Sequence, residues 1–574
     1  MKLKTCLLLL LWTTIALSLR LTQLTAKSPW TDEFSTLVFS LGNSYRTVPL
    51  DRAVSLDELL QPLQINPSAG IAQVLQHLLT ESNHPPLYFI LAHWWMQLWS
   101  RDSGLVSLWV ARSLSAIFGV LSIPAIYFLS AFAFRSILVG QIAAAMMAVS
   151  PFGIFLAQEA RHYTLAILWA IASFGCLIAA IKHIQNQTKL PTLIAIGWIL
   201  INVLGIATHY FFVLTLAAEA FVLLIWQYRR KKKAFNSPWG QIYAVAVGTA
   251  IGGIVWLPIF LQNNSKLTEW IENGEGANIL ALLNPIFQAI AAWITMLSLL
   301  PIEASALPVV IVSGLVMIGF FIWAIPILRR GLITNLQQPK TRIITQVFAG
   351  VVGSAIAIFF FFTYILGIDL TRGARYNFVY FPAVIVLISA SLATYWHPAK
   401  ITNCKKVTSN SWKVSNLSSG KTAVALIWLM GLLSALSVIN NLGYQKYYRP
   451  DLFVQLVQKT SLSSPILIAT THKTHVQTGE MMGIAREFKL AQIPTKPQFL
   501  LAHQSQDPYT STIALQNTIS KQSLPFDLWL VNFYAPLKLE QCYTDTSTVQ
   551  NDLKVAVDGY NYQLYHCQSR AEIN

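Results

Sequence analysis

The sequence predicts an α-helical polytopic membrane protein with about 11 transmembrane helices and a small extracytoplasmic α/β domain at its C-terminal end. Two observations predict this class. Of the 574 residues, 54% are hydrophobic and 11% are charged, which is more apolar surface than one or two soluble domains can bury. The apolar residues also form runs long enough to cross a bilayer, separated by short polar turns.

The formal net charge of +16 does not indicate nucleic-acid binding, because the basic residues fall in short clusters between apolar runs. The main clusters are Arg229–Lys233, Arg329-Arg330 with Lys340 and Arg342, and the lysines between positions 400 and 421. Such clusters are typical of cytoplasmic loops. We therefore expect a multi-pass protein of the cell membrane that binds membrane lipid and no nucleic acid.

The first apolar run lies within residues 2–24 and ends near Arg20. It is short for a span, so it fits either a first span or a cleaved signal peptide. In both cases the polar residues 27–85 are translocated. We expect a juxtamembrane helix at 86–99, because this stretch has only about 14 residues and is rich in tryptophan.

The remaining spans follow from run length and from the basic clusters. They are predicted at 106–133, 137–157, 164–182, 191–208, 211–227, 241–261, 306–328, 343–366, 377–396 and 422–441. The stretch 279–300 is interpreted as re-entrant or interfacial, because a full span there would place Arg329 and Arg330 outside.

After Tyr444 short apolar runs alternate with polar stretches. We predict a transmembrane domain at 1–444, with its first outer loop at 26–85, and a soluble extracytoplasmic α/β domain at 445–574. Cys542 and Cys567 are the only cysteines of the second domain, and a disulfide between them would suit an oxidising compartment.

The adjacent carboxylates Asp32 and Glu33 are the first candidates for chemistry, as a general base with its electrostatic partner or as ligands of a divalent ion. The alternative is that Thr31 or Asp32 caps the following helix. His84 precedes two prolines, which hold the chain rigidly before a helix, although a lone histidine is usually structural.

Two further polar groups are predicted on the outer side. Glu159, Arg161, His162 and Tyr163 lie at the end of a span, where the alternative is an interfacial salt bridge with a tyrosine of the aromatic belt. Arg372, Arg375 and Tyr376 suit a phosphate clamp through planar guanidinium donors, or simple anchoring to lipid headgroups. Paired CxxC, HExxH, Walker and dinucleotide motifs are absent, and we expect no cofactor and no bound metal.

An ordered set of short motifs carries a resemblance. They are Trp30-Thr31-Asp32-Glu33, His84-Pro85-Pro86-Leu87, Arg112–Gly119, Ser150-Pro151 and Gln158–Tyr163. Over residues 5–395 this set resembles the polyprenyl-phosphate-sugar-dependent glycosyltransferases of the GT-C fold, relatives of the protein O-mannosyltransferases and of the lipid A aminoarabinose transferase.

The resemblance implies transfer of a sugar from a lipid-linked phosphate donor to an acceptor glycan, lipid or protein on the non-cytoplasmic side. It maps the catalytic carboxylate onto Asp32, with Glu33 beside it, and places His84 and the Arg372–Tyr376 element near the donor phosphate. One departure concerns the second outer loop, where the mannosyltransferases have an acidic residue after their Arg-Tyr pair, whereas here Glu159 precedes Arg161. This leaves the acceptor and the second catalytic carboxylate open.

The predicted function is therefore that of an inverting membrane glycosyltransferase with Asp32 as general base, Glu33 and Glu159 as further catalytic carboxylates, and the histidine, arginine and tyrosine candidates as substrate-binding residues. A secondary transporter of a polar or anionic solute is the alternative. It would show polar residues in the middle of spans, and Glu219 is one such residue. The sequence identifies neither the sugar nor the acceptor.

Overall fold

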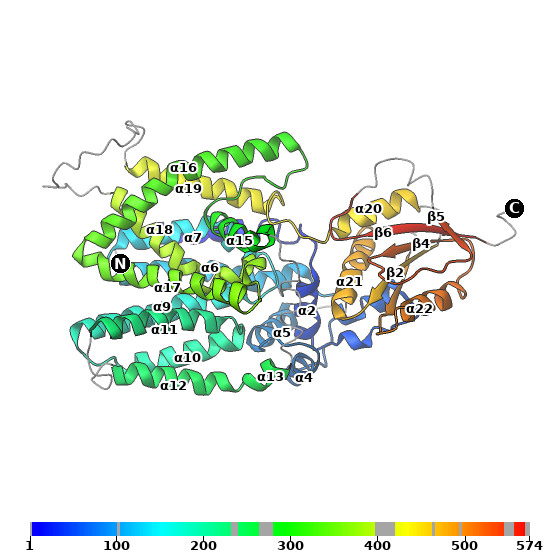
Figure 1. The fold of residues 1–574 in the computed structure, drawn as a ribbon, viewed down its shortest axis with the longest axis horizontal. Coiled ribbons are helices and arrows are strands. Elements are labelled where there is room, and N and C mark those ends of the chain that lie inside the picture. The colour runs from blue at the N-terminus through cyan, green and yellow to red at the C-terminus, as the bar shows by residue number, and fades with distance from the viewer. Residues whose placement is uncertain are drawn as a thin grey trace. The chain divides into compact units, whose positions relative to one another are not determined.

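The computed structural model describes residues 3–99, 104–230, 239–262, 279–396, 420–461, 465–492, 496–544 and 556–568. They form two compact units (Figure 1). The first consists of Met1–Leu24, Asn83–Tyr88 and Arg112–Tyr444, and the second of Thr25–Ser82, Phe89–Ala111 and Gln445–Asn574. The predicted domain boundary at residue 444 is a statement about which parts of the chain fold independently. It stays a prediction. The basic residues at 231–233 and 400–413 lie outside the described residues.

The first unit is a bundle of α-helices around an apolar core. Its helices are α1 (Leu3–Leu21), most of α6 (Leu108–Phe134), α7 (Ile137–Val149), α8 (Pro151–Ala157), α9 (Tyr163–Asn186), α10 (Thr192–Thr208), α11 (Phe212–Arg230), α12 (Trp239–Ile254), α13 (Leu257–Gln262), α15 (Ile279–Leu297), α16 (Leu307–Gln337), α17 (Pro339–Ile365), α18 (Phe381–Trp396) and α19 (Gly420–Ile439). The short 3-10 helices η4 (Leu370–Arg372) and η5 (Ala374–Val379) precede α18.

The helix lengths confirm a polytopic membrane protein. Within the described ranges, seven helices are long and apolar enough to cross a membrane, or eight if the bent pair α7 and α8 is one span. Four shorter apolar helices lie at Thr192–Thr208, Trp239–Ile254, Leu282–Leu297 and Phe381–Trp396. Each predicted span overlaps one of the helices of the bundle, and a helix, α5 (Leu87–Trp99), also forms where the juxtamembrane helix is predicted.

Polar contacts tie α1 to α7. The side-chain amide of Gln141 donates to the Thr5 carbonyl at 3.0 Å. The guanidinium of Arg20 is fully buried and donates to the carbonyls of Ala148 at 3.0 Å and Met147 at 3.1 Å. These carbonyls lie in the last turn of α7, where a helix leaves such groups without an internal partner. α1 is thus packed into the bundle as one of its helices. Its interpretation as a first span requires such packing.

The break between α7 and α8 follows from Ser150 and Pro151. Proline lacks an N–H and has a fixed φ, which suits the first position of a helix and ends the helix before it. The Ser150 hydroxyl caps α8 by accepting from the N–H of Gly153 at 3.3 Å. The two helix axes differ by 58°, and α8 leads directly into the turn at residues 158–162.

The second unit is built on a six-stranded sheet with the order β1-β3-β2-β4-β6-β5. Its strands are β1 (Ala53–Ser55), β2 (Ile466–His472), β3 (Gln498–His503), β4 (Phe526–Val531), β5 (Cys542–Thr544) and β6 (Tyr562–Cys567). β2 is parallel to β3 and β4, and the crossover helices are α21 (His475–Leu490) and α22 (Thr510–Ile519). β2 is buried along almost its whole length because a central parallel strand is covered on both faces.

Residues of the predicted first outer loop complete this sheet. β1 pairs antiparallel with β3, and Val54 lies opposite Phe499. The same unit contains α2 (Thr31–Ser40), α3 (Leu56–Leu59), α4 (Ile71–Glu81), most of α5, and α20 (Pro450–Thr460). The ring of Tyr45 stacks on His475, the first residue of α21, with 5.2 Å between ring centroids. The α/β character predicted for the C-terminal segment is confirmed, and α2 packs in the same unit.

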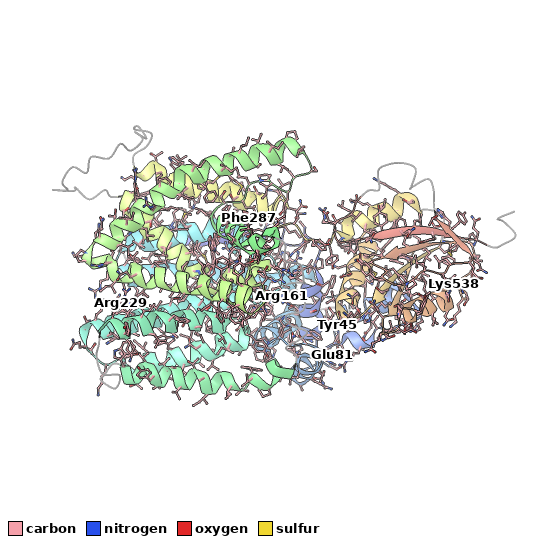
Figure 2. The ribbon with its side chains drawn as sticks, in the orientation of Figure 1. Tyr45, Glu81, Arg161, Arg229, Phe287 and Lys538 are labelled. Atoms are coloured by element: carbon pink, nitrogen blue, oxygen red, sulfur yellow. A yellow bond between two sulfur atoms is a disulfide. The ribbon has the colours of Figure 1, made fainter. Side chains whose placement is uncertain are left out.

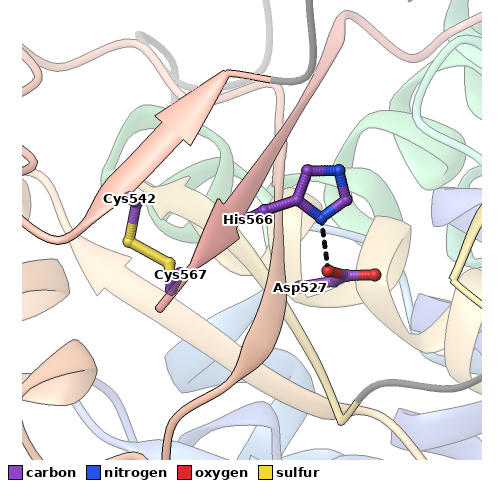
Figure 3. The surroundings of a disulfide bond; sticks show 4 residues. All are labelled: Asp527, Cys542, His566 and Cys567. Atoms are coloured by element: carbon purple, nitrogen blue, oxygen red, sulfur yellow. Dashed lines mark hydrogen bonds and ion pairs between the residues drawn. A yellow bond between two sulfur atoms is a disulfide. The ribbon is translucent and has the colours of Figure 1, made fainter. Parts of the chain in front are cut away.

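Cys542 and Cys567 lie opposite each other on β5 and β6 and form a disulfide (Figure 3). The predicted pairing is therefore confirmed. Beside it, His566 of β6 faces Asp527 of β4, and the His566 Nδ1 lies 2.7 Å from a carboxylate oxygen of Asp527. The two contacts join the three last strands of the sheet.

Replacing Arg20 tests whether α1 is held in the bundle by its guanidinium. The Arg20→Met variant should lower the free energy of unfolding by about 1–3 kcal/mol, because two buried carbonyls lose their donor. Thermal unfolding of the detergent-solubilised protein measures this. Arg229→Met, which changes an exposed arginine at the end of α11, is the control and should unfold like the wild type. Equal melting temperatures for all three proteins would contradict the role given to Arg20.

Candidate functional site

The turn between α8 and α9 positions the central residues of the site. α8 ends at Ala157 and α9 begins at Tyr163, so residues 158–162 leave the helical path. The side-chain amide of Gln158 donates to the Thr22 carbonyl at 3.0 Å. The Ser115 hydroxyl donates to the Arg161 carbonyl at 2.8 Å and lies 2.6 Å from the hydroxyl of Tyr88. Side chains of α5 and α6 therefore fix the backbone of this turn.

Basic side chains from four chain segments converge on this turn. A terminal nitrogen of Arg161 lies 3.1 Å from Nε2 of His84. The ring centroid of His162 lies 5.7 Å from that of His84 and 4.5 Å from that of His209, which follows α10. Arg375 of η5 adds a second guanidinium, whose charge acts on both His162 and His209. We call His84, Arg161, His162, His209 and Arg375 the basic cluster.

The basic cluster lies at one end of the helix bundle and is largely shielded from water. Arg161 and His162 are each 1% exposed, whereas His84, His209 and Arg375 are partly exposed. Figure 2 shows Arg161 and Arg229 at opposite ends of the bundle. Two residues that the sequence predicts on opposite sides of the membrane are thus separated along the helices.

Electrostatics hold two of the imidazoles in their neutral form. Both His162 and His209 lie in turns outside the spanning helices, and the pKa of each is well below the usual value of 6.5. For His162 the largest cause is burial, followed by the neighbouring His209, Arg161, His84 and Arg375. At neutral pH these two imidazoles therefore add no positive charge to that of the two guanidinium groups.

Aromatic rings surround the basic cluster. Tyr163 lies 4.7 Å from His162 between ring centroids, and the Arg161 guanidinium carbon lies 5.9 Å from the Tyr163 ring. Tyr376 is buried, with the Arg375 guanidinium carbon 5.6 Å from its ring centroid. The structure thus brings together six residues that the sequence singled out, which are His84, Arg161, His162, Tyr163, Arg375 and Tyr376.

Two other predicted residues are placed differently. Arg372 is exposed, and its Nε lies 3.5 Å from a carboxylate oxygen of the buried Asp369, which is not part of the basic cluster. Glu159 is 2% exposed, and its carbonyl accepts from the N–H of Arg161 at 2.7 Å. Glu159 and Arg161 lie in a turn and not on a helix, so helical spacing does not describe their relation.

Asp32 and Glu33 belong to the second unit and lie in the first turn of α2. The alternative that Thr31 or Asp32 caps this helix is wrong, because the capping position is Trp30 and no side chain caps it. Glu33 is fully buried, with a carboxylate oxygen 3.9 Å from Nζ of Lys446. Asp32 is partly exposed. The two neighbouring carboxylates thus have different surroundings, one inside the unit and one open to water.

Lys446 is the main residue that the sequence-based interpretation missed, whereas His209 is interpreted from the sequence as an interfacial residue. Thr208-His209-Tyr210 follows a predicted span on the same side as residues 158–163, so topology alone was a signal for His209. The sequence contains no such signal for Lys446, because its partner Glu33 lies more than 400 residues earlier in the chain. Among the described residues, no group of three or more histidine, cysteine, aspartate or glutamate side chains is arranged to hold a metal ion.

The contact between Glu33 and Lys446 predicts a structural effect that can be measured. Lys446→Met should destabilise the protein by about 3–5 kcal/mol, because it leaves a fully buried carboxylate without its cation. Thermal unfolding measures this, and the double variant Glu33→Gln/Lys446→Met should recover much of the loss. If the double variant is no more stable than Lys446→Met, the two side chains do not depend on each other. Lys489→Met, which removes an exposed partner of Asp57, is the control.

Comparison with known proteins gives matches by structure alone. No protein-family model and no curated protein matches the sequence. ArnT from Cupriavidus metallidurans, bound to undecaprenyl phosphate, is similar to this chain with 11% identity and a TM-score of 0.49, over 97% of both chains. The Archaeoglobus fulgidus oligosaccharyltransferase in its apo form has 13% identity and a TM-score of 0.44, over 92% of this chain and 69% of its own.

A third similar structure is that of AglB, the oligosaccharyltransferase of Archaeoglobus fulgidus, in complex with an inhibitory peptide and a dolichol-phosphate. It has 11% identity and a TM-score of 0.44, over 92% of this chain and 69% of its own. Because the identities are at most 13% and the TM-scores are below 0.5, the function is argued from the residues of this chain alone.

Proposed function

We propose that this protein is a membrane glycosyltransferase that moves a sugar from a polyprenyl-phosphate-linked donor to an acceptor on the non-cytoplasmic face. The observation that carries the proposal is the basic cluster. Two guanidinium and three imidazole groups gather at one end of an apolar helix bundle, where an anionic head group joined to a long apolar chain would meet both charge and lipid.

The chemistry of the basic cluster favours a phosphate. Guanidinium groups present planar pairs of N–H donors that match phosphate oxygens, and charge-assisted hydrogen bonds are about twice as strong as neutral ones. Arg161 is buried, so its interaction with an anion is weakly screened by water and salt. We assign the donor phosphate to Arg161, Arg375 and His84, with Tyr163 and Tyr376 packed beside them.

A small cavity in the first unit lies beside the segment that carries Arg375. It is lined mostly by apolar and aromatic side chains of α15 and α17, and by Thr371, Asn377 and Tyr380 of the segment that carries Arg375. We propose that the isoprenoid next to the phosphate packs along these helices. Arg372, exposed on the same segment, is kept as a proposed contact to the donor.

The proposed reaction is a direct displacement with inversion. Asp32 accepts the proton of the acceptor hydroxyl, whose oxygen forms a bond to the anomeric carbon of the sugar. The bond between that carbon and the phosphate oxygen breaks, and its electron pair stays on the released polyprenyl phosphate. The basic cluster stabilises this growing negative charge. We propose that Glu33, paired with Lys446, holds the first turn of α2, and that Glu159 is a second carboxylate of the site.

The disulfide supports an extracytoplasmic place for the second unit. Disulfides form and persist in oxidising compartments and are rare in the cytosol. Cys542 and Cys567 lie on neighbouring strands of the sheet. We therefore propose that the sheet domain faces the non-cytoplasmic side, which is also the side that the basic clusters of the sequence predict.

One observation favours the transporter as a second candidate. Glu219 of α11 is 3% exposed, and one of its carboxylate oxygens lies 3.0 Å from the Ser173 hydroxyl of α9. Ionisable residues inside membrane helices often mark a transport path. Glu219→Gln separates the candidates, since a transporter that uses this carboxylate would lose solute uptake, whereas the glycosyltransferase would keep sugar transfer.

Sugar transfer tests the proposed activity directly. Membranes with the wild type should transfer radiolabel from a polyprenyl-phosphate sugar, and Asp32→Asn should lower the rate by about 100-fold or more because the general base is lost. Arg375→Ala should lower it by a similar factor through loss of charge stabilisation. Asp57→Asn and Arg342→Ala, which change exposed residues of the same two units, are the matched controls. Undiminished transfer by Asp32→Asn would refute the role of Asp32.

Thiol labelling tests the proposed orientation. In intact cells treated with a membrane-impermeant reductant, an impermeant maleimide should label the protein at Cys542 and Cys567, because the sheet domain is expected outside. Without the reductant it should not label them, since both sulfurs are in the disulfide. The Cys542→Ser/Cys567→Ser variant is the control. Labelling of these positions only after the cells are permeabilised would place the domain in the cytoplasm.

A further inference from the structure

The three imidazoles of the basic cluster differ in how their nitrogens are used. Arg161 always donates, so Nε2 of His84 must accept its hydrogen bond at 3.1 Å and carries no proton. Nδ1 of His209 accepts from the N–H of Phe211 at 3.0 Å and carries no proton either. Protonation of either nitrogen would break an existing hydrogen bond. In this arrangement Nε2 of His84 and Nδ1 of His209 both act as hydrogen-bond acceptors.

His162 is different. Neither of its ring nitrogens has a hydrogen-bond partner among the described residues, although the side chain is 1% exposed. A buried polar group without a partner is costly, and in a native structure it often indicates a ligand or a catalytic role. His162 is also the one histidine of the cluster that can gain a proton without losing a hydrogen bond.

The charge around His162 explains what would trigger protonation. Burial and the nearby guanidinium groups hold the pKa of His162 well below 6.5. The ring is therefore neutral at physiological pH when no phosphate is bound. A phosphate dianion in the cluster would offset the guanidinium charges and offer an acceptor for the imidazolium. The donor in the proposed reaction is a phosphodiester with one negative charge, whereas the released product is a monoester whose second pKa is about 6.

We infer that His162 takes up one proton from solution when a phosphate monoester binds in the basic cluster, so that the site distinguishes the released polyprenyl phosphate from the sugar-linked donor by charge. This inference rests on the proposed function, because it places the lipid phosphate in this cluster. At higher pH His162 loses this proton, which weakens binding of the monoester and favours its release.

The tyrosines near His162 do not account for such a proton. Tyrosines titrate near pH 10, far above the range in question. The buried carboxyl group of Glu159 lies in the same turn and is the remaining candidate, which a variant of His162 distinguishes. The charged and titratable groups around the ring come from several places in the chain. They are His84 before α5, Tyr88 in α5, Glu159 and Arg161 in the turn, Tyr163 in α9, His209 after α10, and Arg375 in η5.

Binding of two matched probes to the detergent-solubilised full chain tests the inference. Farnesyl phosphate is a monoester, and farnesyl methyl phosphate is a diester of the same chain length. Between about pH 7 and 8.5, the Kd for the monoester should rise about tenfold per pH unit because one proton must be bound from solution. The Kd for the diester should not change with pH. Calorimetry in buffers of different ionisation enthalpy should show uptake of about one proton for the monoester alone.

His162→Gln should remove the pH dependence of monoester binding, and His162→Asn is the second variant if glutamine does not fit. Retained diester binding shows that either variant is folded. His183→Gln changes a histidine at the other end of α9 that contacts Thr188, so it should behave like the wild type. Persistence of the full pH dependence in both variants would assign the proton to another group and overturn the inference.

The remaining outcomes separate this inference from the proposed function. If the wild type binds the monoester with no pH dependence while sugar transfer proceeds, the inference is overturned and the proposed function stands. If neither ester binds, the phosphate site and the inference both fail, and the transfer assay decides whether the activity stands without them.

Discussion

The hydrogen bond between Arg161 and His84 is the interaction on which the candidate site depends. A guanidinium that is shielded from water must be satisfied by acceptors, because a buried charge without partners is costly. Here the His84 imidazole accepts one hydrogen bond from Arg161, and the Ser115 hydroxyl donates to the Arg161 carbonyl. The arginine thus keeps its charge in a place where water is scarce. An anion that enters such a place meets a stronger field than it would at an open surface.

The same physical rule shapes other parts of the molecule. Arg20 is fully buried and is stabilised by backbone carbonyls at the end of α7, while the fully buried Glu33 faces Lys446. In both cases a charge inside the protein joins segments that are distant in the sequence. Arg20 locks the first helix to the bend between α7 and α8. Glu33 ties the helix that carries Asp32 to the segment that leads into the sheet domain.

The basic cluster and the carboxylate helix are suited to different parts of one reaction. A phosphate leaving group needs fixed positive charge and hydrogen-bond donors, which the turn at 158–162, the residue before the prolines and η5 supply together. An acceptor hydroxyl needs a base, and we propose Asp32, which is partly exposed at the start of α2, for this role. We infer that a neutral histidine beside the two arginines, His162, can take up a proton when a phosphate monoester binds.

Much of the candidate site was predictable because topology and motif identity are local properties. Apolar runs and basic clusters place the turns of residues 158–163, 208–210 and 372–376 at one end of the bundle, and proline before α5 marks His84. Four of the predicted residues, His84, Arg161, His162 and Arg375, are in the cluster. The disulfide could be predicted as well, since the C-terminal segment has just two cysteines.

The sequence by itself determined the class of the protein, the positions of its spans and the residue types at the end of the bundle, because hydropathy and charge act within each segment. Only the tertiary structure decided that Arg372 contacts Asp369, that Glu33 is buried against Lys446, and that β1 joins a sheet built from the far end of the chain. These are contacts between residues with no periodic or local relation. Such contacts depend on how helices and strands pack, which no pattern within a single segment encodes.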